Sequence, residues 1–244
     1  MNRFFVPKEN IEPGRALITG EDVKHIAKVL RMRVGETLIV CDGASMQYRG
    51  TIAAMHDKEI ELTLEEGCRC EAELPYELTV LQGLPKAGKM EWIVQKCTEL
   101  GMHSLIPIDA ARSVVRDTKK NFETKRLRYE KVAAEAAKQS QRGILPRVEG
   151  LQSFSSVDYG AYDLILLLYE EEKERTLKRA LQALPSRPAR VALVIGPEGG
   201  IEKEEARQLI ANGAISVSLG KRILRTETAA MAAISMLQYA WDEV

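Results

Sequence analysis

The first candidate for chemistry is a glycine-rich loop at residues 196–200, with the sequence Gly-Pro-Glu-Gly-Gly. It directly follows the apolar run Val191 to Ile195, which is typical of a buried strand. Three glycines in five residues permit left-handed turns and let a ligand lie against bare backbone, while Pro197 stiffens the loop. A tight strand-to-helix connection, in which Glu202 to Glu205 favour the start of the next helix, explains the same residues equally well.

The second candidate is the loop Leu219 to Ala229, which carries three cations: Lys221, Arg222 and Arg225. A helix is predicted to begin here, and either Thr226 or Thr228 can cap it. Backbone N–H groups, hydroxyls and cations would then converge in one short turn, which is typical of an anion-binding site. A capped amphipathic helix packed on a sheet would explain the alanines that follow, but not the Arg-x-x-Arg pair.

A third loop, Gly83 to Lys89, matches the phosphate-binding pattern G-x-x-x-x-G-K in all but its last position. Met90 replaces the Ser or Thr whose hydroxyl ligates the magnesium ion of a nucleotide. No metal-binding Asp follows the apolar run Leu164 to Leu168 either. The sequence therefore favours a strand-to-helix turn with a surface lysine over a P-loop nucleotidase.

The sequence gives little support for a metal site, a disulfide framework or a membrane-spanning segment. The four cysteines are too few for a disulfide scaffold, and the Cys68–Cys70 pair has no partner pair at zinc-site spacing. His25, His56 and His103 are isolated in sequence, so we expect no metal site. The N-terminus lacks the apolar core of a signal peptide, and no apolar run approaches the roughly 20 residues of a spanning helix, so we expect a cytoplasmic protein without a membrane partner.

The charge of the chain is unevenly distributed. Lysine and arginine balance aspartate and glutamate at 35 each, which would ordinarily argue against a polyanionic partner. Between Arg112 and Arg147, however, eleven basic residues face four acidic ones, a local net charge of +7. On a predicted helix over 122–141, Arg128, Lys131, Lys138 and the adjoining Arg142 share one face, which indicates either an RNA-binding stripe or a solvated surface.

The elements that must position these loops fall into two regions. Residues 1–72 alternate short strand-like runs with turns, and their one helical stretch, at 21–32, has Asp22 as a plausible N-cap. This pattern predicts a small β-barrel or sandwich, with the boundary in the acidic stretch Glu65 to Pro75.

From Tyr76 onward, apolar strands alternate with helices. We predict strands at 78–82, 105–108, 164–169, 191–195 and 215–219, and helices at 90–100, 122–141, 171–183, 202–211 and 226–241. Gly101, Gly143 and Gly213 stand where a left-handed glycine would end three of the helices. The alternation predicts an α/β fold with a mostly parallel sheet, whose ligands bind beyond the carboxyl ends of the strands.

Five segments together resemble the RsmE-type 16S rRNA uridine N3-methyltransferases of the SPOUT superfamily. The matching residues are His25 to Arg31, Lys89 to Gly101, the Glu135 to Arg142 run EAAKQSQR, the loop GPEGG, and LGKRILRTETA at 219–229. One departure stands at Gln141, where the commonest family pattern has a glycine, so the local loop geometry is open.

The resemblance implies a PUA-like RNA-binding β-barrel over 1–72 and a SPOUT domain over 73–244, in which the chain threads through a loop to form a trefoil knot. It also implies a homodimer, S-adenosylmethionine as cofactor, and 16S rRNA of the small ribosomal subunit as substrate. A catalytically silent RNA-binding or ribosome-assembly protein on the same fold is the alternative, and failure to bind S-adenosylmethionine would distinguish it.

Functional residues follow from the resemblance together with the charges of the loops. From the mixed charge of the loop at 219–229, Arg225 is expected to stabilise the uracil anion, and Glu198 or Glu227 to take the N3 proton or orient the base. The cofactor would be held by Leu168, Tyr169, Ile195, Gly196, Gly199, Gly200, Leu219, Gly220, Arg222, Ile223, Leu224, Thr228 and Ala229. RNA contacts are expected from Arg3, Lys24, Arg31, Arg33, Arg49, Lys89, Arg112, Arg128, Lys131, Lys138 and Arg142.

Overall fold

The computed structural model describes residues 1–86 and 88–243, and the chain divides into two compact units. The first unit comprises Met1–Glu73 and Ala134–Leu145, and the second comprises Leu74–Ala133 and Pro146–Val244. The sequence places the boundary after residue 72, but the structure adds the stretch 134–145 to the first unit. Residues 87 and 244 lie outside the described part of the chain. The loop Gly83 to Lys89 is therefore described except for residue 87.

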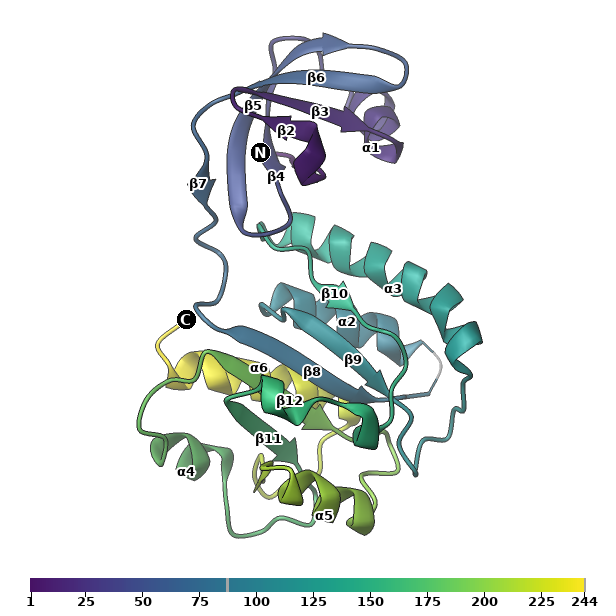
Figure 1. Ribbon diagram of the computed structural model, residues 1–244, viewed down its shortest axis with the longest axis vertical. Helices are drawn as coiled ribbons and strands as arrows, with labels where there is room; N and C mark the ends of the chain where they lie inside the picture. Colours follow the sequence, from purple (N-terminus) through teal and green to yellow (C-terminus); the bar gives the residue numbers. More distant parts are fainter. Residues whose placement is uncertain (87, 244) are drawn as a thin grey trace. The chain divides into compact units, whose positions relative to one another are not determined.

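One seven-stranded sheet forms the first unit, with the strand order β1-β4-β5-β6-β3-β2 and β7 paired to β5 (Figure 1). Its strands are β1 (Arg3–Phe5), β2 (Ile11–Glu12), β3 (Arg15–Thr19), β4 (Thr37–Cys41), β5 (Met46–Met55), β6 (Glu59–Leu64) and β7 (Cys68–Arg69). Only β1 and β4 pair in parallel. Alternating apolar residues of the strands form its core, so the expectation of a small β region before an α/β region is confirmed.

The helical stretch of this unit begins at Glu21 but has a different N-cap from the one expected. A short 3₁₀ turn spans Lys8–Asn10, α1 spans Glu21–Lys24, and a π-helical turn continues it over His25–Val29. The N-cap of α1 is Gly20, at φ 75°, rather than Asp22. Because the chain leaves β3 through this left-handed glycine, Asp22 falls inside the first turn of the helix.

Six parallel strands form the sheet in the described part of the second unit, in the order β10-β9-β8-β12-β11-β13. They are β8 (Glu77–Gly83), β9 (Ser104–Ile108), β10 (Arg147–Val148), β11 (Leu164–Leu168), β12 (Arg190–Ile195) and β13 (Ile215–Val217). The helices are α2 (Lys89–Glu99), α3 (Lys119–Gln139), α4 (Leu177–Gln182), α5 (Lys203–Ala211) and α6 (Thr226–Ala240), with 3₁₀ turns at Phe154–Ser156 and Tyr159–Ala161. Residues 134–139 of α3 belong to the first unit.

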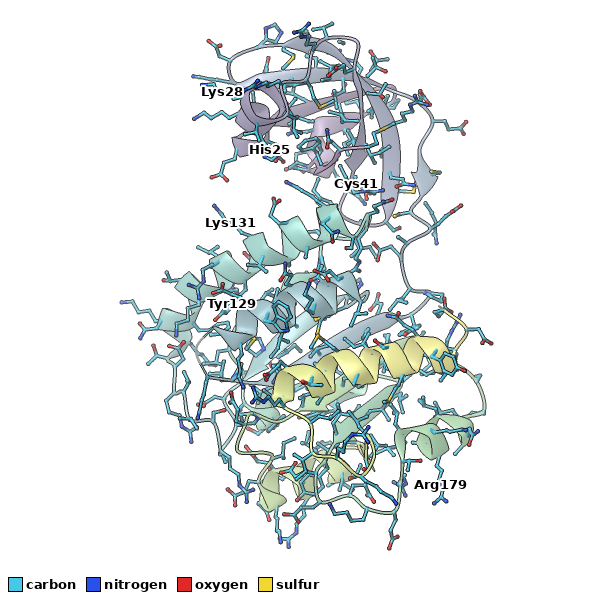
Figure 2. The ribbon with its side chains drawn as sticks, turned by 180° about the vertical axis from the view of Figure 1, so that it is seen from behind. His25, Lys28, Cys41, Tyr129, Lys131 and Arg179 are labelled. Atoms are coloured by element: carbon cyan, nitrogen blue, oxygen red, sulfur yellow. The ribbon has the colours of Figure 1, made fainter. Side chains whose placement is uncertain are left out.

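Helices cover both faces of the parallel sheet. On β12, Val191, Leu193 and Ile195 join one apolar core, which also contains residues of α2, α4 and α6. Ala192 and Val194 join the other core, which contains residues of α5. Figures 1 and 2 show α6 and α5 on opposite sides of the sheet. The doubly covered α/β fold predicted from the sequence is confirmed.

Several predicted boundaries shift for local reasons. The helix expected from Glu171 begins only at Leu177, because the Glu172 carboxylate accepts hydrogen bonds from the backbone N–H groups of Glu174 and Arg175 and holds a turn there. The strand expected to reach Leu219 ends at Val217, and the sequence analysis missed the short strand β10.

Three helices end in the same motif, in which two backbone N–H groups reach back to the last turn. Gly101 at φ 90° and Gly213 at φ 91° occupy its left-handed position after α2 and α5, as predicted. After α3, however, Gln141 at φ 62° occupies it, and Gly143 does not have a positive φ. The departure at Gln141 therefore places a strained glutamine where a glycine would fit without cost.

Candidate functional site

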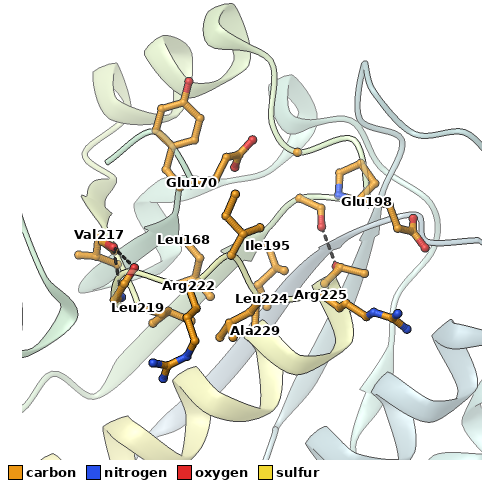
Figure 3. A pocket seen from close by; sticks show the side chains of 18 of the residues that line it. Leu168, Glu170, Ile195, Glu198, Val217, Leu219, Arg222, Leu224, Arg225 and Ala229 are labelled. Atoms are coloured by element: carbon orange, nitrogen blue, oxygen red, sulfur yellow. Dashed lines mark hydrogen bonds between the residues drawn. The ribbon is translucent and has the colours of Figure 1, made fainter. Parts of the chain in front are cut away.

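The main candidate site is a cavity of about 520 Å³ in the second unit, at the carboxyl ends of β11, β12 and β13 (Figure 3). The loops that follow these strands form its walls, as expected for an open parallel sheet. The lining residues are Lys89, 168–170, Lys173, 195–200, 217–226 and Ala229. The two glycine- and cation-containing loops singled out in the sequence thus meet at one cavity.

The cavity has an apolar floor and a glycine wall. Leu168, Ile195 and Val217 are buried at the strand ends, and Leu224 and Ala229 face them from the last loop and α6 (Figure 3). At Gly200, which has φ 73°, an added Cβ would lie 1.9 Å from Glu170 Oε1. The volume and the mixed lining suit a nucleoside-sized ligand with an apolar ring.

Tight packing fixes the glycine loop on the neighbouring strand end. A Cβ at Gly83 would lie 2.5 Å from Pro197 Cδ, and one at Gly196 would lie 2.8 Å from Ile201 Cγ1. A Cβ at Gly199 would lie 2.7 Å from the backbone oxygen of Arg112. These glycines are therefore needed for close backbone approach, so the loop is both a tight connection and part of the cavity.

A triad of charged side chains lies at one side of the cavity. Lys89 Nζ is 2.9 Å from Glu198 Oε1 and 3.1 Å from Glu227 Oε2, so it joins the starts of α2 and α6 to the glycine loop. Burial works against the charged form of Glu198, but hydrogen bonds from Lys89 and from the Lys86 N–H outweigh it and lower the pKa of the carboxyl. The same two carboxylates raise the pKa of Lys89. Glu198 is therefore a carboxylate at neutral pH.

The structure shows surroundings of Lys89 that the sequence did not indicate. The expected RNA contact of Lys89 stays a prediction, and its ammonium lines the cavity and pairs with both candidate proton acceptors. The pairing joins residues more than one hundred positions apart, so no local pattern indicated it.

Arg225 is the N-cap residue of α6 and is exposed at the mouth of the cavity. Neither Thr226 nor Thr228 caps the helix as predicted, because the Thr226 hydroxyl is buried and donates to the Gly196 carbonyl oxygen at 2.7 Å. Within residues 1–86 and 88–243, Lys221, Arg222 and Arg225 have no ion pair. Figure 3 shows Arg222 and Arg225 extending to different sides of the cavity.

The predicted cofactor residues line this cavity with one exception. Thr228 is exposed on the first turn of α6 and is not part of the lining. Four further lining residues were not predicted, Glu170, Lys173, Val217 and Ser218, and they follow from the positions of the strand ends rather than from any motif. Thr226 also lines the cavity, although the sequence indicated it only as a possible helix cap. Gln82 was also missed; it is a fully buried side chain of β8 whose amide donates to the Thr226 hydroxyl at 2.8 Å.

Several predicted RNA contacts are engaged in ion pairs instead. The Arg142 side chain is only 2% exposed, and its guanidinium binds Glu73 at 2.7 Å within the first unit, so it is not available to RNA. It also lies beyond the end of α3, because the left-handed residue at 141 has already turned the chain. Lys138 pairs with Asp22 and Glu135.

The remaining candidates differ in their surroundings. Arg3 is engaged within the first unit, where its guanidinium donates to Gln47 Oε1 at 2.9 Å. Figure 2 shows Lys131 on the outer side of α3, while Tyr129 points inward from the same helix. Four of the candidates are exposed: Lys24, Arg31, Arg33 and Arg49. Arg49 Nε is 3.6 Å from Glu65 Oε1, and the other three have no ion pair within the described residues.

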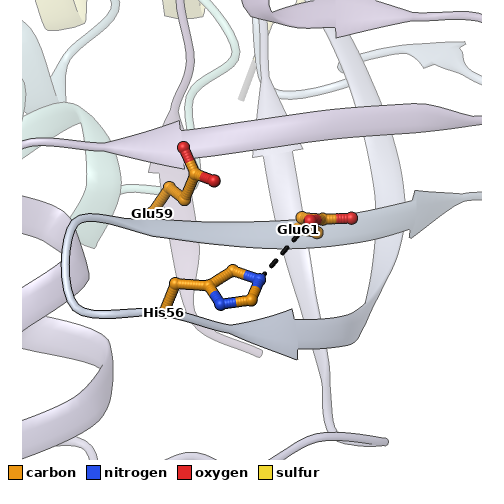
Figure 4. Close-up of side chains that lie close together, drawn as sticks. All are labelled: His56, Glu59 and Glu61. Carbon is orange, nitrogen blue, oxygen red and sulfur yellow. Dashed lines mark ion pairs between the residues drawn. The ribbon is translucent and has the colours of Figure 1, made fainter.

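One group of possible metal ligands lies in the first unit, at the turn between β5 and β6 (Figure 4). His56, Glu59 and Glu61 could each offer one ligand atom, and these atoms lie within 4.8 Å of one another. His56 Nε2 is 3.5 Å from Glu61 Oε1, so the histidine isolated in sequence has carboxylate neighbours in space. Exposed acidic side chains often gather on such turns, and this group has no further feature of a metal site.

The fold and the cavity define an α/β domain that binds a nucleoside-like ligand beyond the carboxyl ends of its strands, joined to a small β unit. Residues 72–238 match the family model of an RNA methyltransferase domain, and residues 18–65 match that of an RNA methyltransferase PUA domain. The ribosomal RNA small subunit methyltransferase E of Bacillus subtilis is 37% identical, and the match covers 98% of this chain and 96% of that protein. The chain therefore belongs to the family of ribosomal RNA small subunit methyltransferase E.

Solved structures resemble the whole chain. A ribosomal RNA small subunit methyltransferase E from Neisseria gonorrhoeae, solved with S-adenosylmethionine, superposes with a TM-score of 0.85 at 26% identity, covering 99% of this chain and 98% of its own. A Legionella pneumophila protein, also solved with S-adenosylmethionine, gives a TM-score of 0.83 at 30% identity, covering 98% and 97%. Within the described residues, no helix has both the length and the apolarity to cross a membrane.

Proposed function

We propose that this protein transfers a methyl group from S-adenosylmethionine to N3 of a specific uridine in the 16S rRNA of the small ribosomal subunit. The observation that carries the proposal is the cavity itself, where an apolar floor, a glycine wall and exposed cations meet beyond the strand ends. Relatives that are named ribosomal RNA small subunit methyltransferases support ribosomal RNA as the substrate class. Two similar structures solved with S-adenosylmethionine support the cofactor.

The residues of the cavity fit S-adenosylmethionine. Leu168, Ile195 and Leu224 would pack against its adenine and sugar, and the backbone of 196–200 and 219–224 would supply hydrogen bonds. When bound, the cofactor supplies a methyl group that is already activated on a sulfonium. The protein therefore mainly has to align the nucleophile, which is a positioning task.

Arg225 would stabilise the negative charge of the nucleophile. Uracil N3 is a poor nucleophile while it carries its proton, and the deprotonated ring spreads negative charge onto its two carbonyl oxygens. An exposed guanidinium at the mouth of the cavity, without an acidic partner among the described residues, would stabilise that anion.

Glu198 and Glu227 remain the candidates for taking the N3 proton or orienting the base. The lowered pKa of Glu198 makes it a weak base and a good hydrogen-bond acceptor, which favours an orienting role for this carboxylate. Lys89 would keep both carboxylates in place while the substrate enters.

RNA would be held by cations that are not already neutralised. In the first unit these are Lys24, Arg31 and Arg33, and in the second unit Lys221 is exposed without an ion pair among the described residues. The paired candidates Arg49, Arg112 and Arg128 would contribute less, because an acidic side chain already lies beside each. Phosphate contacts of this kind make affinity fall steeply as the salt concentration rises.

We also propose that the protein is a homodimer. Trp92 of α2 is 49% exposed, and Met236 and Tyr239 of α6 are 42% and 78% exposed, on two helices that pack together in one unit. Aromatic and methionine side chains are enriched in protein interfaces, and a second copy would cover this surface. Sedimentation of the purified protein tests this, and a monomer at micromolar concentration would contradict it.

Methylation of small subunits tests the proposed function directly. Purified protein is incubated with methyl-labelled S-adenosylmethionine and small subunits that lack the modification, and the labelled nucleotide is then located by mass spectrometry. We expect one N3-methyluridine in 16S rRNA. Label on another nucleotide would overturn the specificity, and cofactor binding without any transfer would favour the silent RNA-binding alternative.

Replacing Gly200 by Val tests the cofactor site. Because a Cβ would meet Glu170 and the backbone has φ 73°, we expect the affinity for S-adenosylmethionine to fall by about 100-fold or more, a typical loss of two to three kcal/mol for a blocked contact. Gly213→Val is the matched control, since Gly213 also has a positive φ but open space around it. Unchanged affinity for the Gly200 variant in calorimetry would place the cofactor elsewhere.

A further inference from the structure

Gln82 is a buried polar side chain near the end of a strand that is otherwise largely apolar. It is 0% exposed, and its strand neighbours Val80 and Leu81 belong to the apolar cores. An amide in such a place is costly unless its polar atoms are hydrogen-bonded. What its amide binds therefore decides why the sequence keeps a glutamine here.

The amide starts a hydrogen-bond chain with a fixed direction. Gln82 Nε2 donates to the Gly83 carbonyl oxygen at 2.9 Å and to the Thr226 hydroxyl at 2.8 Å. That hydroxyl lies 2.7 Å from the Gly196 carbonyl oxygen, which can only accept. Since the hydroxyl has one proton and gives it to Gly196, it must accept from Gln82, and this fixes the orientation of the amide.

The hydrogen-bond chain joins β8 to two segments that line the cavity. Gln82 lies at the end of β8, Gly196 begins the glycine loop, and Thr226 begins α6 directly after Arg225. The ion triad of Lys89, Glu198 and Glu227 joins the start of α2, which follows β8 in the chain, to the same two segments. The buried hydrogen-bond chain and the partly exposed ion triad therefore both fix the position of the glycine loop relative to the start of α6.

The other end of the amide has no partner. Gln82 Oε1 is buried and finds no hydrogen-bond donor among the described residues. A buried acceptor left in this state costs about 1–3 kcal/mol, so the glutamine is not there for stability. An apolar side chain of the same shape would leave the core intact and would lose the hydrogen bonds to the Gly83 carbonyl oxygen and to Thr226.

We propose that Gln82 is a positioning residue that, through Thr226, holds the glycine loop and Arg225 in register for the cofactor and the substrate base. Gln82 does not line the cavity, so it acts only through the hydroxyl that does. The turnover readout rests on the proposed methyl transfer. The cofactor-binding and unfolding readouts do not depend on it.

Near-isosteric replacements test the proposal. For Gln82→Met and for Thr226→Val, we expect the affinity for S-adenosylmethionine to fall about tenfold, the effect of one lost hydrogen bond, and turnover at saturating substrates to fall at least as much. The melting temperature of Gln82→Met should stay within about 2 °C of the parent, because the unpaired acceptor is removed together with the donor. Thr226→Ser keeps the hydroxyl and should retain parent affinity and turnover.

Gln238→Leu is the matched control. Gln238 is also a buried glutamine whose amide donates to a backbone carbonyl, that of Leu100, but it lies at the far end of α6. We expect this variant to lose stability and to keep the parent cofactor affinity. Gln82→Met should therefore lose affinity but not stability, and Gln238→Leu should lose stability but not affinity. This contrast separates a positioning role from a merely structural one.

Three outcomes would overturn the proposal: parent cofactor affinity and turnover in Gln82→Met, a loss of stability alone in both glutamine variants, or additive effects in the double variant Gln82→Met/Thr226→Val. Because the two residues belong to one hydrogen-bond chain, the losses in cofactor affinity of the two single variants should instead be strongly non-additive. If Gln82→Met does not fold, the Thr226→Val and Thr226→Ser pair carries the test. If the parent protein transfers no methyl group, the proposed function fails, while calorimetry and melting still decide the role of Gln82.

Discussion

The basic stretch between Arg112 and Arg147 and the loop between Leu219 and Arg225 both contain several cations, but the two regions use them differently. Along the basic stretch most cations are ion-paired: Arg116 with Asp109, Lys125 with Asp117, Arg126 with Glu123 and Glu130, Arg128 with Glu91, Lys138 with Asp22, and Arg142 with Glu73. In the short loop, Lys221, Arg222 and Arg225 are exposed without an ion pair among the described residues.

This difference shows that local net charge is a poor guide to where a polyanion binds. The basic stretch has a net charge of +7 in sequence, but carboxylates from other segments neutralise much of it in space. Its cations hold segments together, and RNA would have to displace their partners. The loop has fewer cations, and they stand at the cavity where the reaction would occur.

The largest effect should come from Arg225. Arg225→Ala should lower methylation of small subunits by about 10³-fold, the loss expected when a group that stabilises developing charge is removed. Cofactor affinity in calorimetry should stay close to the parent value, because the backbone and the apolar floor hold the cofactor.

Arg126→Ala on α3 is the comparison for Arg225, since its guanidinium is engaged by Glu123 and Glu130. We expect its turnover to remain near the parent value. Equal losses in the two variants would remove the distinction between paired and unpaired cations.

The next effect concerns stability in the basic stretch. Arg142→Met leaves the Glu73 carboxylate, 7% exposed, with only the Gly143 and Ile144 N–H groups as partners. Breaking such a buried pair should lower the free energy of unfolding by about 3 kcal/mol, as measured by denaturant titration. The double variant Glu73→Gln/Arg142→Met should recover part of the loss, and a single variant as stable as the parent would mean that the pair is not structural.

A smaller effect separates the two regions in RNA binding. Lys221→Ala should make the plot of log affinity against log salt concentration shallower by about one, the contribution of one phosphate contact. Arg128→Ala should change the slope less, because Glu91 lies 2.5 Å from its guanidinium. The same slope change in both variants would show that ion pairing in the free protein does not decide which cations bind RNA.

The smallest effect lies at the end of the basic helix. Gln141→Gly removes the strain of a left-handed glutamine, worth roughly 1–2 kcal/mol, but gives the unfolded chain more freedom. The net gain in unfolding free energy should be below about 1 kcal/mol, visible as a rise of a few degrees in melting temperature. A loss of stability would show that the Gln141 side chain makes a contribution larger than the strain.

The positions and types of most elements could be predicted from local patterns. The strand at 164–168 and residues 191–195 of β12 are continuous apolar runs, and Gly101 and Gly213 end their helices as predicted. Prediction failed where a side chain overrides the local pattern, as at Glu172, whose carboxylate delays the start of α4. The trefoil knot implied by the resemblance stays a prediction.

The candidate site was predictable in part. Both loops and most cofactor residues follow from motifs within short segments, because the carboxyl ends of parallel strands necessarily meet at one edge. Gln82 was missed, Thr226 does not have the predicted capping role, and the ion pairs of Lys89 were not foreseen, since these contacts depend on partners far away in sequence.

By itself the sequence determined the class of fold, the two loops at the cavity and the family, because apolar periodicity, glycine spacing and contiguous motifs are local properties of the chain. The tertiary structure decided which charges are neutralised and which polar groups are joined. Glu73 meets Arg142, Lys89 meets Glu198 and Glu227, and Gln82 meets Thr226 only after the chain has folded. Ion pairing and hydrogen bonding depend on distances of a few ångströms, and positions along the chain do not set those distances.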